Sequence, residues 1–253
     1  MPTFTLAHLS DIHLPPLPHV SASELMGKRI LGYLNWYRKR KHIHLAYVLQ
    51  KLIDDLKLQN PDHVVVTGDL VNISTMQEFE YAGHWLSQLG LPEEVTIIPG
   101  NHDAYVPYPP GSGMDTLHAY MTDNLDESKP NGGNVRREGG RPAFPFIRCF
   151  GNIALVGLRS GVPTPPFMAS GMLGQAQQQE LHKILIRLKN ENMFRVVLIH
   201  HPPLPGQTGW TRALRDADSL SDLLKETGSE LVLYGHLHRQ SVDRLEAHGT
   251  ISR

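Results

Sequence analysis

The stretch Val95-Thr96-Ile97-Ile98-Pro99-Gly100-Asn101-His102-Asp103 joins a short apolar run to a polar turn. The apolar run predicts a buried strand, and Pro99-Gly100 ends it abruptly. The three polar residues then fall at the carboxyl end of the strand, where α/β proteins place their chemistry. An amide oxygen can bind a metal, an imidazole can transfer a proton near neutral pH, and a carboxylate can orient the imidazole. Considered alone, the turn is better explained as a polar cap on the next segment. Whether it belongs to a functional site therefore depends on the rest of the chain.

Four other predicted strands end in the same way. They cover residues 3–9, 64–67, 195–199 and 231–234. The polar residues that follow them are Asp11 with His13, Asp69, His200 with His201, and His236 with His238. Helices are expected between the strands, at 21–41, 45–56, 75–89, 175–189 and 216–225, together with a short helix near 115–122 and a hairpin over 144–158. This order predicts an α/β sandwich that contains mixed sheets.

The polar residues at these strand ends are typical metal ligands. Consecutive strand ends lie along one edge of an α/β fold, so the side chains are expected to converge. In Asp11-x-His13 and His236-x-His238, residues i and i+2 of an extended segment point the same way and can reach one metal or two adjacent metals. Oxygen and imidazole donors without thiolate suit Mn, Fe or Zn. The donors are too many for one ion, so we expect two ions that share a carboxylate, an arrangement suited to phosphate esters.

Length and composition limit the other possibilities. The chain has 253 residues, which is enough for one large domain or two small ones. With 24 basic and 25 acidic residues it has no charge excess of the kind that indicates nucleic-acid binding. The one cysteine, Cys149, excludes an internal disulfide framework and a cysteine-built zinc site. The N-terminus has no signal-peptide pattern and no apolar run reaches membrane-spanning length, which predicts a cytoplasmic protein.

The strand-end motifs together resemble those of the calcineurin-like metallophosphoesterase superfamily. They are Asp11-x-His13, Gly68-Asp69, Gly100-Asn101-His102, His200 and Gly235-His236-x-His238. Each motif is weak alone, but their order and their placement agree with the superfamily from residue 6 to residue 238. Residues 9–13 and 67–70 are most similar to class III cyclic-nucleotide phosphodiesterases and related glycerophosphodiesterases.

The resemblance implies a four-layer αββα sandwich with two mixed β-sheets, within a single domain over 1–253. Seven residues take metal-binding roles in it: Asp11, His13 and His238 for the first ion, Asn101, His200 and His236 for the second, and Asp69 as the bridge. It implies hydrolysis of a small-molecule phosphodiester through in-line attack by a metal-bound hydroxide. His102 would stabilise the transition state or protonate the leaving oxygen, and Asp103 could orient His102.

Two parts of the chain depart from a minimal member of the superfamily. Residues 14–44 form a basic, aromatic insert that we expect to cover the site as a cap, and residues 28–41 are a candidate for peripheral membrane or lipid contact. The basic run 38–41 is otherwise typical of a solvated helix face. The chain ends soon after His238, where similar proteins carry further strands of the second sheet.

The remaining histidines lack ligand spacing. His8 is expected in the core, and His201 is expected either behind the ligands or at the rim of the site. Surface positions are expected for seven others, which are His42, His44, His63, His84, His118, His182 and His248.

Three alternatives to a phosphodiesterase stay open. A lipid-linked pyrophosphatase of the type that cleaves UDP-diacylglucosamine would use the same motifs and give the insert an acyl chain to cover. A non-catalytic scaffold is the second, although scaffolds can lose motif residues and this chain keeps all seven. A phosphomonoesterase is the third. It is disfavoured because no arginine stands just after Asp69 or just before Asn101, where the resemblance to the superfamily's protein phosphatases would place the groups that bind the second phosphate charge. Arg159 or Arg212 could still reach the site through the fold.

Overall fold

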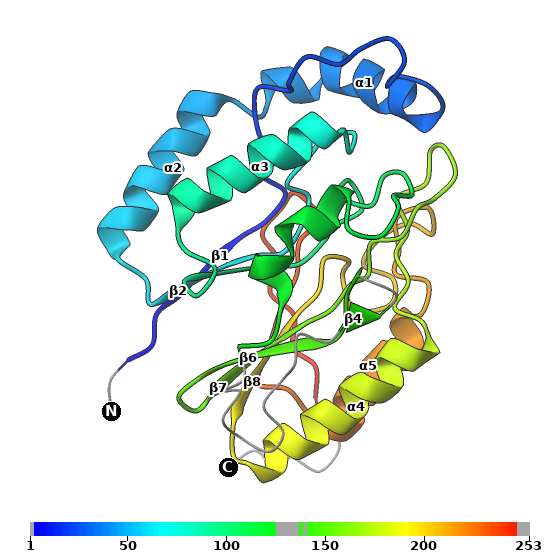
Figure 1. Ribbon diagram of the computed structural model, residues 1–253. Helices are drawn as coiled ribbons and strands as arrows, with labels where there is room; N and C mark the ends of the chain where they lie inside the picture. The colour runs from blue at the N-terminus through cyan, green and yellow to red at the C-terminus, as the bar shows by residue number, and fades with distance from the viewer. Residues whose placement is uncertain (1–2, 125–136, 139–140, 247–253) are drawn as a thin grey trace.

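The computed structural model describes residues 3–124, 137–138 and 141–246 (Figure 1). Two sheets pack face to face, and helices cover the outer face of each sheet. This is the predicted αββα arrangement. His248 lies outside the described residues. Within the described ranges, every helix is too short or too polar to cross a membrane.

The first sheet is built from three parallel strands. They are β1 (Leu6–Leu9), β2 (His63–Val66) and β3 (Val95–Ile97), in the order β1-β2-β3. Every residue of β2 is buried, as expected for a central parallel strand that is covered on both faces. Helices α2 (Ala46–Gln59) and α3 (Met76–Leu89) lie on the outer face. A capping box formed by Thr75 and Glu78 fixes the start of α3.

The second sheet is mixed. Its strands are β6 (Phe146–Phe150), β7 (Ile153–Gly157), β8 (Phe194–Leu198) and β9 (Leu231–Leu233), in that order. The predicted hairpin is the antiparallel pair β6–β7, and the other two pairs are parallel. Side chains alternate along β8, so that Val196 and Leu198 pack toward the first sheet. Val197 packs on the other side with α4 (Gln175–Asn190) and α5 (Ala217–Thr227).

The remaining elements lie outside the two large sheets. The 3₁₀ helix η2 (Gly113–Met121) occurs where a short helix was expected, and β4 (Arg137–Glu138) pairs with β5 (Arg141–Pro142) in a separate ladder. The 14–44 insert contains α1 (Lys28–Arg38) and the 3₁₀ helix η1 (Arg40–His42). Figure 1 shows α1 at the outer edge of the molecule, away from both sheets.

Candidate metal centre

The loops that follow the parallel strands meet at the carboxyl edges of the two sheets. Backbone hydrogen bonds hold them in register beyond the strands themselves. The amide of Asp11 donates to the backbone carbonyl of Gly68 at 3.1 Å, and the amide of His13 donates to the backbone carbonyl of Asp69 at 2.9 Å. In the second sheet, the amide of Gly235 donates to the backbone carbonyl of His200 at 3.0 Å. The loops are therefore fixed relative to one another before any side-chain contact is considered.

The first group of converging side chains consists of Asp11, His13, Asp69 and His238. Their possible ligand atoms all lie within 4.8 Å of one another. The Nδ1 of His13 is 3.0 Å from the carbonyl of Val71, which makes Nδ1 the protonated nitrogen. Its Nε2 is buried, faces the group and has no hydrogen-bond partner among the described residues. A buried lone pair without a partner is costly, and metal-binding histidines show this same pattern of one nitrogen held by a carbonyl.

The second group consists of Asn101, His200 and His236. The Oδ1 of Asn101 lies 3.1 Å from His200 Nε2 and 2.8 Å from His236 Nδ1. The opposite nitrogens of the two rings face backbone carbonyls, of Thr67 at 2.7 Å and of Arg212 at 3.0 Å. With those nitrogens protonated, two imidazole lone pairs are aimed at one amide oxygen. A cation between them would relieve the repulsion.

Asp69 lies between the two groups. Its Oδ2 is 3.7 Å from His13 Nε2, and its Oδ1 is 3.5 Å from His200 Nε2. Burial raises the pKa of Asp69 to about 7, so the protein alone does not compensate its charge. The pKa of His200 is raised because nearby carboxylates, Asp69 first, outweigh the effect of its burial. Both shifts indicate positions that favour additional positive charge, and the donor set fits one cation on each side of Asp69.

The backbone at these positions adopts an uncommon conformation. Five of the seven predicted ligands have positive φ, namely Asp11 at 54°, His13 at 45°, Asp69 at 57°, His236 at 71° and His238 at 51°. Such conformations of non-glycine residues cost on the order of 1–3 kcal/mol each and cluster at functional sites. The close approach of the loops also requires glycine, since a Cβ at Gly100 would collide with the Asp69 carboxylate. The positive-φ backbone therefore lowers local stability but orients the ligand side chains.

Asp103 holds the loops rather than the His102 ring. Its carboxylate accepts hydrogen bonds from the amides of Asp69 at 2.7 Å, Leu70 at 2.9 Å and Gly100 at 2.8 Å. These bonds join the loop after β2 to the loop after β3. The predicted role of Asp103 in orienting His102 is replaced by a role in positioning Asp69 and its neighbours.

His102 is oriented by a different set of contacts. Its Nδ1 lies 2.6 Å from the carbonyl of Asn72, and its ring stacks on Tyr105 with the centroids 5.5 Å apart. The ring also meets the ring of His13 edge to face at 4.8 Å, so His102 borders the first group. Burial, and then the charge of Arg40, lower the pKa of His102 well below its usual value. The free protein therefore keeps His102 neutral.

Two residues of the insert reach the centre, and the sequence pattern did not identify either of them. Arg40 was expected on a solvated face, but it is buried and its Nη1 lies 3.1 Å from His102 Nδ1. His44 was expected at the surface, but its ring lies 4.9 Å from the ring of His13 and 5.9 Å from that of His238. Possible ligand atoms of these three histidines lie within 4.8 Å of one another. Neither residue lies directly after a strand, and that position is what identified the seven predicted ligands.

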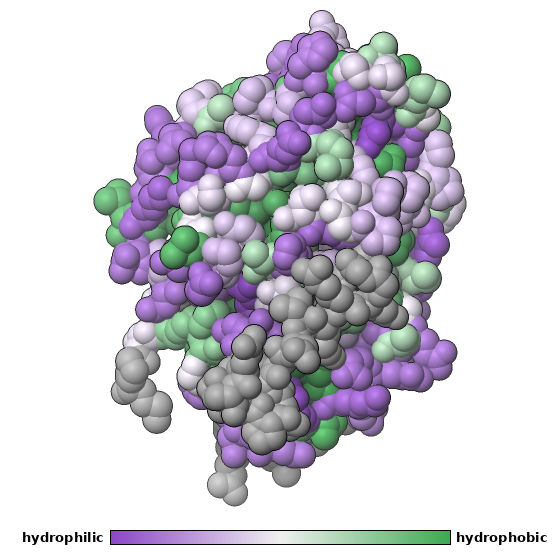
Figure 2. Space-filling model, viewed as in Figure 1, coloured by the Kyte–Doolittle hydropathy of each residue, from purple (hydrophilic) through white to green (hydrophobic). Residues whose placement is uncertain are grey.

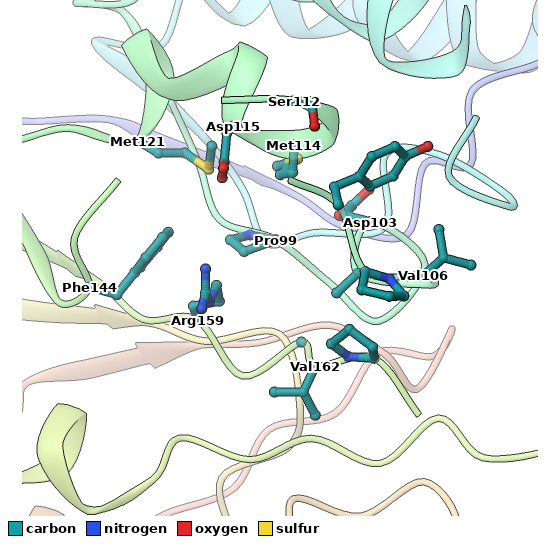
Figure 3. Close-up of a pocket in the computed structure, with 15 residues that line it drawn as sticks. Pro99, Asp103, Val106, Ser112, Met114, Asp115, Met121, Phe144, Arg159 and Val162 are labelled. Carbon is teal, nitrogen blue, oxygen red and sulfur yellow. The ribbon is translucent and has the colours of Figure 1, made fainter. Parts of the chain in front are cut away.

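The two arginines considered from the sequence have different positions. Arg212 reaches the second group, where its Nη2 donates to the carbonyl of His236 at 2.9 Å. Arg159 instead lines a separate cavity of about 130 Å³ behind the loop after β3, together with Pro99, Met114 and Phe144 (Figure 3). None of the seven predicted ligands lines that cavity.

The other histidines take structural or surface positions. His201 is buried with both ring nitrogens bonded, to Ser160 at 2.8 Å and Ala169 at 3.1 Å, so it has no nitrogen left for a metal. His63 was expected at the surface, but it is buried in central strand β2 and bonded to Thr96 at 2.7 Å. His8 was expected in the core, but it is exposed on β1, the edge strand of its sheet, where its Nε2 lies 2.8 Å from the Thr67 hydroxyl. The remaining five are exposed or partly exposed, namely His19, His42, His84, His118 and His182.

Comparisons with known proteins give one family. The family model described as calcineurin-like phosphoesterase matches residues 4–240. No curated protein is significantly similar to the chain. Among solved structures, the chain is similar to a purple acid phosphatase from seeds of yellow lupin (Lupinus luteus), with 14% identity and a TM-score of 0.47. The match covers 93% of this chain and only 38% of that protein.

Proposed function

Because the chain belongs to the calcineurin-like phosphoesterase family, we propose that it hydrolyses small phosphodiesters at the centre formed by the two groups of ligands. The observation that carries this proposal is Asp69, a buried carboxylate with one oxygen toward each group. A shared carboxylate between two sets of oxygen and imidazole donors is suited to two ions of Mn, Fe or Zn. When bound, such ions supply the Lewis acidity that activates water and neutralises phosphoryl charge.

The residues of the chain have separate tasks in this proposal. Three residues would hold the first ion, namely Asp11, His13 and His238, and three would hold the second, namely Asn101, His200 and His236. Asp69 would join the two. His44 borders the first group from the insert, and we assign it a supporting contact to the first ion. Asp103 keeps the loops of Asp69 and Asn101 at a fixed distance through its bonds to backbone amides.

His102 acts on the leaving oxygen. With Nδ1 bonded to Asn72, its Nε2 is the nitrogen available to the substrate. The neutral ring of the free protein must gain a proton to act as a general acid, and the negative charge of a bound phosphoester favours that gain. The ring then donates the proton from Nε2 to the departing alkoxide, while the carbonyl of Asn72 keeps its orientation.

A phosphomonoesterase is the second candidate, and a specific observation favours it. The preference for diesters was predicted from the absence of arginine beside Asp69 and Asn101 in the sequence, yet Arg40 and Arg212 lie beside the two groups. A guanidinium can bind the second negative charge of a monoester. We still favour the diester, because each of these arginines already donates to a backbone carbonyl, of Asn72 at 3.4 Å and of His236 at 2.9 Å.

The experiment that tests this proposal compares kcat/KM for bis-nitrophenyl phosphate and nitrophenyl phosphate at one pH and one metal concentration. We expect the diester to be preferred in the wild type. Arg40→Gln should then lower activity on both substrates by similar factors. A preference for the monoester that Arg40→Gln removes would identify a phosphomonoesterase. Absence of hydrolysis of both, with two ions bound, would favour a scaffold or a substrate such as a nucleotide-linked lipid pyrophosphate.

A further inference from the structure

The outer face of α1 is apolar and exposed. Ile30, Leu34 and Tyr37 recur at the i, i+4, i+7 spacing of one helix face and are 47%, 40% and 55% exposed. Gly32, on the opposite side of the helix, is its one buried residue. A surface helix of a globular protein normally turns its apolar stripe toward the core. Here the stripe faces outward.

More exposed apolar side chains surround this stripe in the sequence. Met26, just before α1, is 75% exposed. Ile43 and Tyr47, between α1 and the first turn of α2, are 68% and 64% exposed. Figure 2 shows hydrophobic and hydrophilic surfaces interleaved over the end of the molecule that carries α1. Large apolar side chains gathered in one exposed region are uncommon on a monomeric protein and mark an interaction surface.

The charge of the same segment has one sign. Residues 25–53 contain no aspartate or glutamate, although the whole chain has a formal net charge of −1. They contain seven basic residues, namely Lys28, Arg29, Arg38, Lys39, Arg40, Lys41 and Lys51. Arg40 is buried, whereas Arg38 and Lys39 are exposed at the end of the apolar stripe. The Lys41 ammonium lies 3.4 Å from the centre of the Tyr37 ring, so charge and apolar surface meet there.

We propose that the outer face of α1, formed by Met26, Ile30, Leu34, Tyr37, Arg38 and Lys39, docks on an anionic lipid surface. An exposed apolar helix face with aromatic residues buries itself at the level of lipid headgroups. Basic side chains beside it add attraction to anionic lipids. A nucleic acid would use the charge but not the apolar stripe. The proposal stands independently of the phosphoester chemistry.

Docking in this orientation places the metal centre beside the lipid surface. The inner side of the same segment delivers Arg40 to His102 and His44 to the first group. The inner side of α1 also packs on the loops after β2 and β3, through Gly32 against Ile73 and Tyr105. The docking face and the centre therefore belong to one continuous piece of structure.

The experiment is sedimentation of the full chain with vesicles of phosphatidylcholine alone and of phosphatidylcholine mixed with phosphatidylglycerol. We expect binding to the mixed vesicles only, and weaker binding as salt is raised. Ile30→Ser/Leu34→Ser should lower the affinity at least tenfold, since two apolar side chains leave the interface. Arg38→Glu/Lys39→Glu should lower it by a similar factor at low salt.

Matched variants provide the controls. Leu58→Ser changes an 83% exposed leucine at the far end of α2, and Lys183→Glu reverses an exposed charge on α4, so both should bind vesicles like the wild type. Thermal unfolding of every variant checks that the fold is retained. Failure of the wild type to bind mixed vesicles overturns the proposal. So does equal binding by the α1 variants, or a dimer in solution that Ile30→Ser/Leu34→Ser dissociates, which would assign the face to a second copy of the chain.

Discussion

The candidate metal centre is supplied by two unlike regions of the molecule. The strand-end loops provide the seven predicted ligands; five of them are buried, and backbone carbonyls orient three of the histidines. The 14–44 insert provides Arg40 and His44, which enter from outside the sheets. The His238 side chain, on the side that the insert approaches, is 42% exposed, whereas His200 is fully buried. The comparison indicates that the strand ends define the centre and that the insert modifies its accessible side.

Asp69→Asn changes the carboxylate that lies between the two ligand groups of the strand-end region. The change keeps the size of the side chain but removes the charge that faces both groups. Loss of a residue that only supports a metal ligand typically costs 10–100-fold, so loss of the bridge should cost more than about 100-fold in activity. Elemental analysis should also find fewer than two ions per chain. Asp54→Asn, at an exposed position on α2, is the control. Normal activity in Asp69→Asn would remove Asp69 from the centre.

His102→Ala tests a strand-end residue that touches the insert through Arg40. A general acid typically contributes about 10²–10⁴-fold, and a nitrophenolate leaves without protonation. We therefore expect a much larger loss of kcat on alkyl phosphodiesters than on nitrophenyl phosphodiesters. Comparison of the two substrate series in the same variant measures this difference. Equal losses would make His102 a stabiliser of charge on the phosphoryl group instead.

His44→Ala tests the insert itself. If His44 supports the first ion, its removal should weaken one of two metal affinities by about tenfold and leave the other unchanged. His42→Ala is the matched control, because His42 lies on the same segment but is exposed. Calorimetric titration of the metal-free variants with Mn²⁺ gives the affinities. Two unchanged affinities in His44→Ala would limit the insert to covering the centre.

His63→Gln changes a buried histidine that belongs to neither region, so it provides a reference for both. Burial, and then the charge of Arg148, lower the pKa of His63 to about 4. The unfolded chain, with a pKa near 6.5, takes up the proton first as the pH falls, so this group destabilises the fold between about pH 6.5 and 4. Through this group, the free energy of unfolding changes with pH by at most about 1.4 kcal/mol per pH unit.

Urea unfolding of wild type and His63→Gln at pH 7, 6 and 5 measures the effect. Glutamine can still hydrogen-bond Thr96 but does not titrate, so the variant should lose less stability than the wild type on acidification. Its metal content should stay normal. Parallel stability curves for the two proteins would contradict the assignment.

The sequence could predict the strand-end region because topology controls it. Alternating strands and helices bring the carboxyl ends of the parallel strands together, so polar residues at those ends must meet. Asp69 was predicted as the bridge from the resemblance of its motif, and its distances to His13 and His200 place it between the two groups. The parallel order of the first sheet follows from the same rule, although mixed sheets were expected.

The insert could not be predicted in the same way, because tertiary packing decides which of its residues face inward. Arg40 is one of four consecutive basic residues, and only the turn of η1 makes it the buried one. His102 is held by the carbonyl of Asn72, and a backbone carbonyl has no signature in the sequence. His63 was misplaced because it begins its strand, where exposure is usual, although β2 is central.

A centre bridged by Asp69 is tested most directly by electron paramagnetic resonance of the metal-free chain titrated with Mn²⁺, with parallel elemental analysis. We expect two ions per chain and the spectrum of an exchange-coupled pair, since Asp69 would join the two ions through one carboxylate. Asp69→Asn should show no coupled spectrum. A single ion at saturation, or two ions without magnetic coupling in the wild type, would contradict a centre bridged by Asp69.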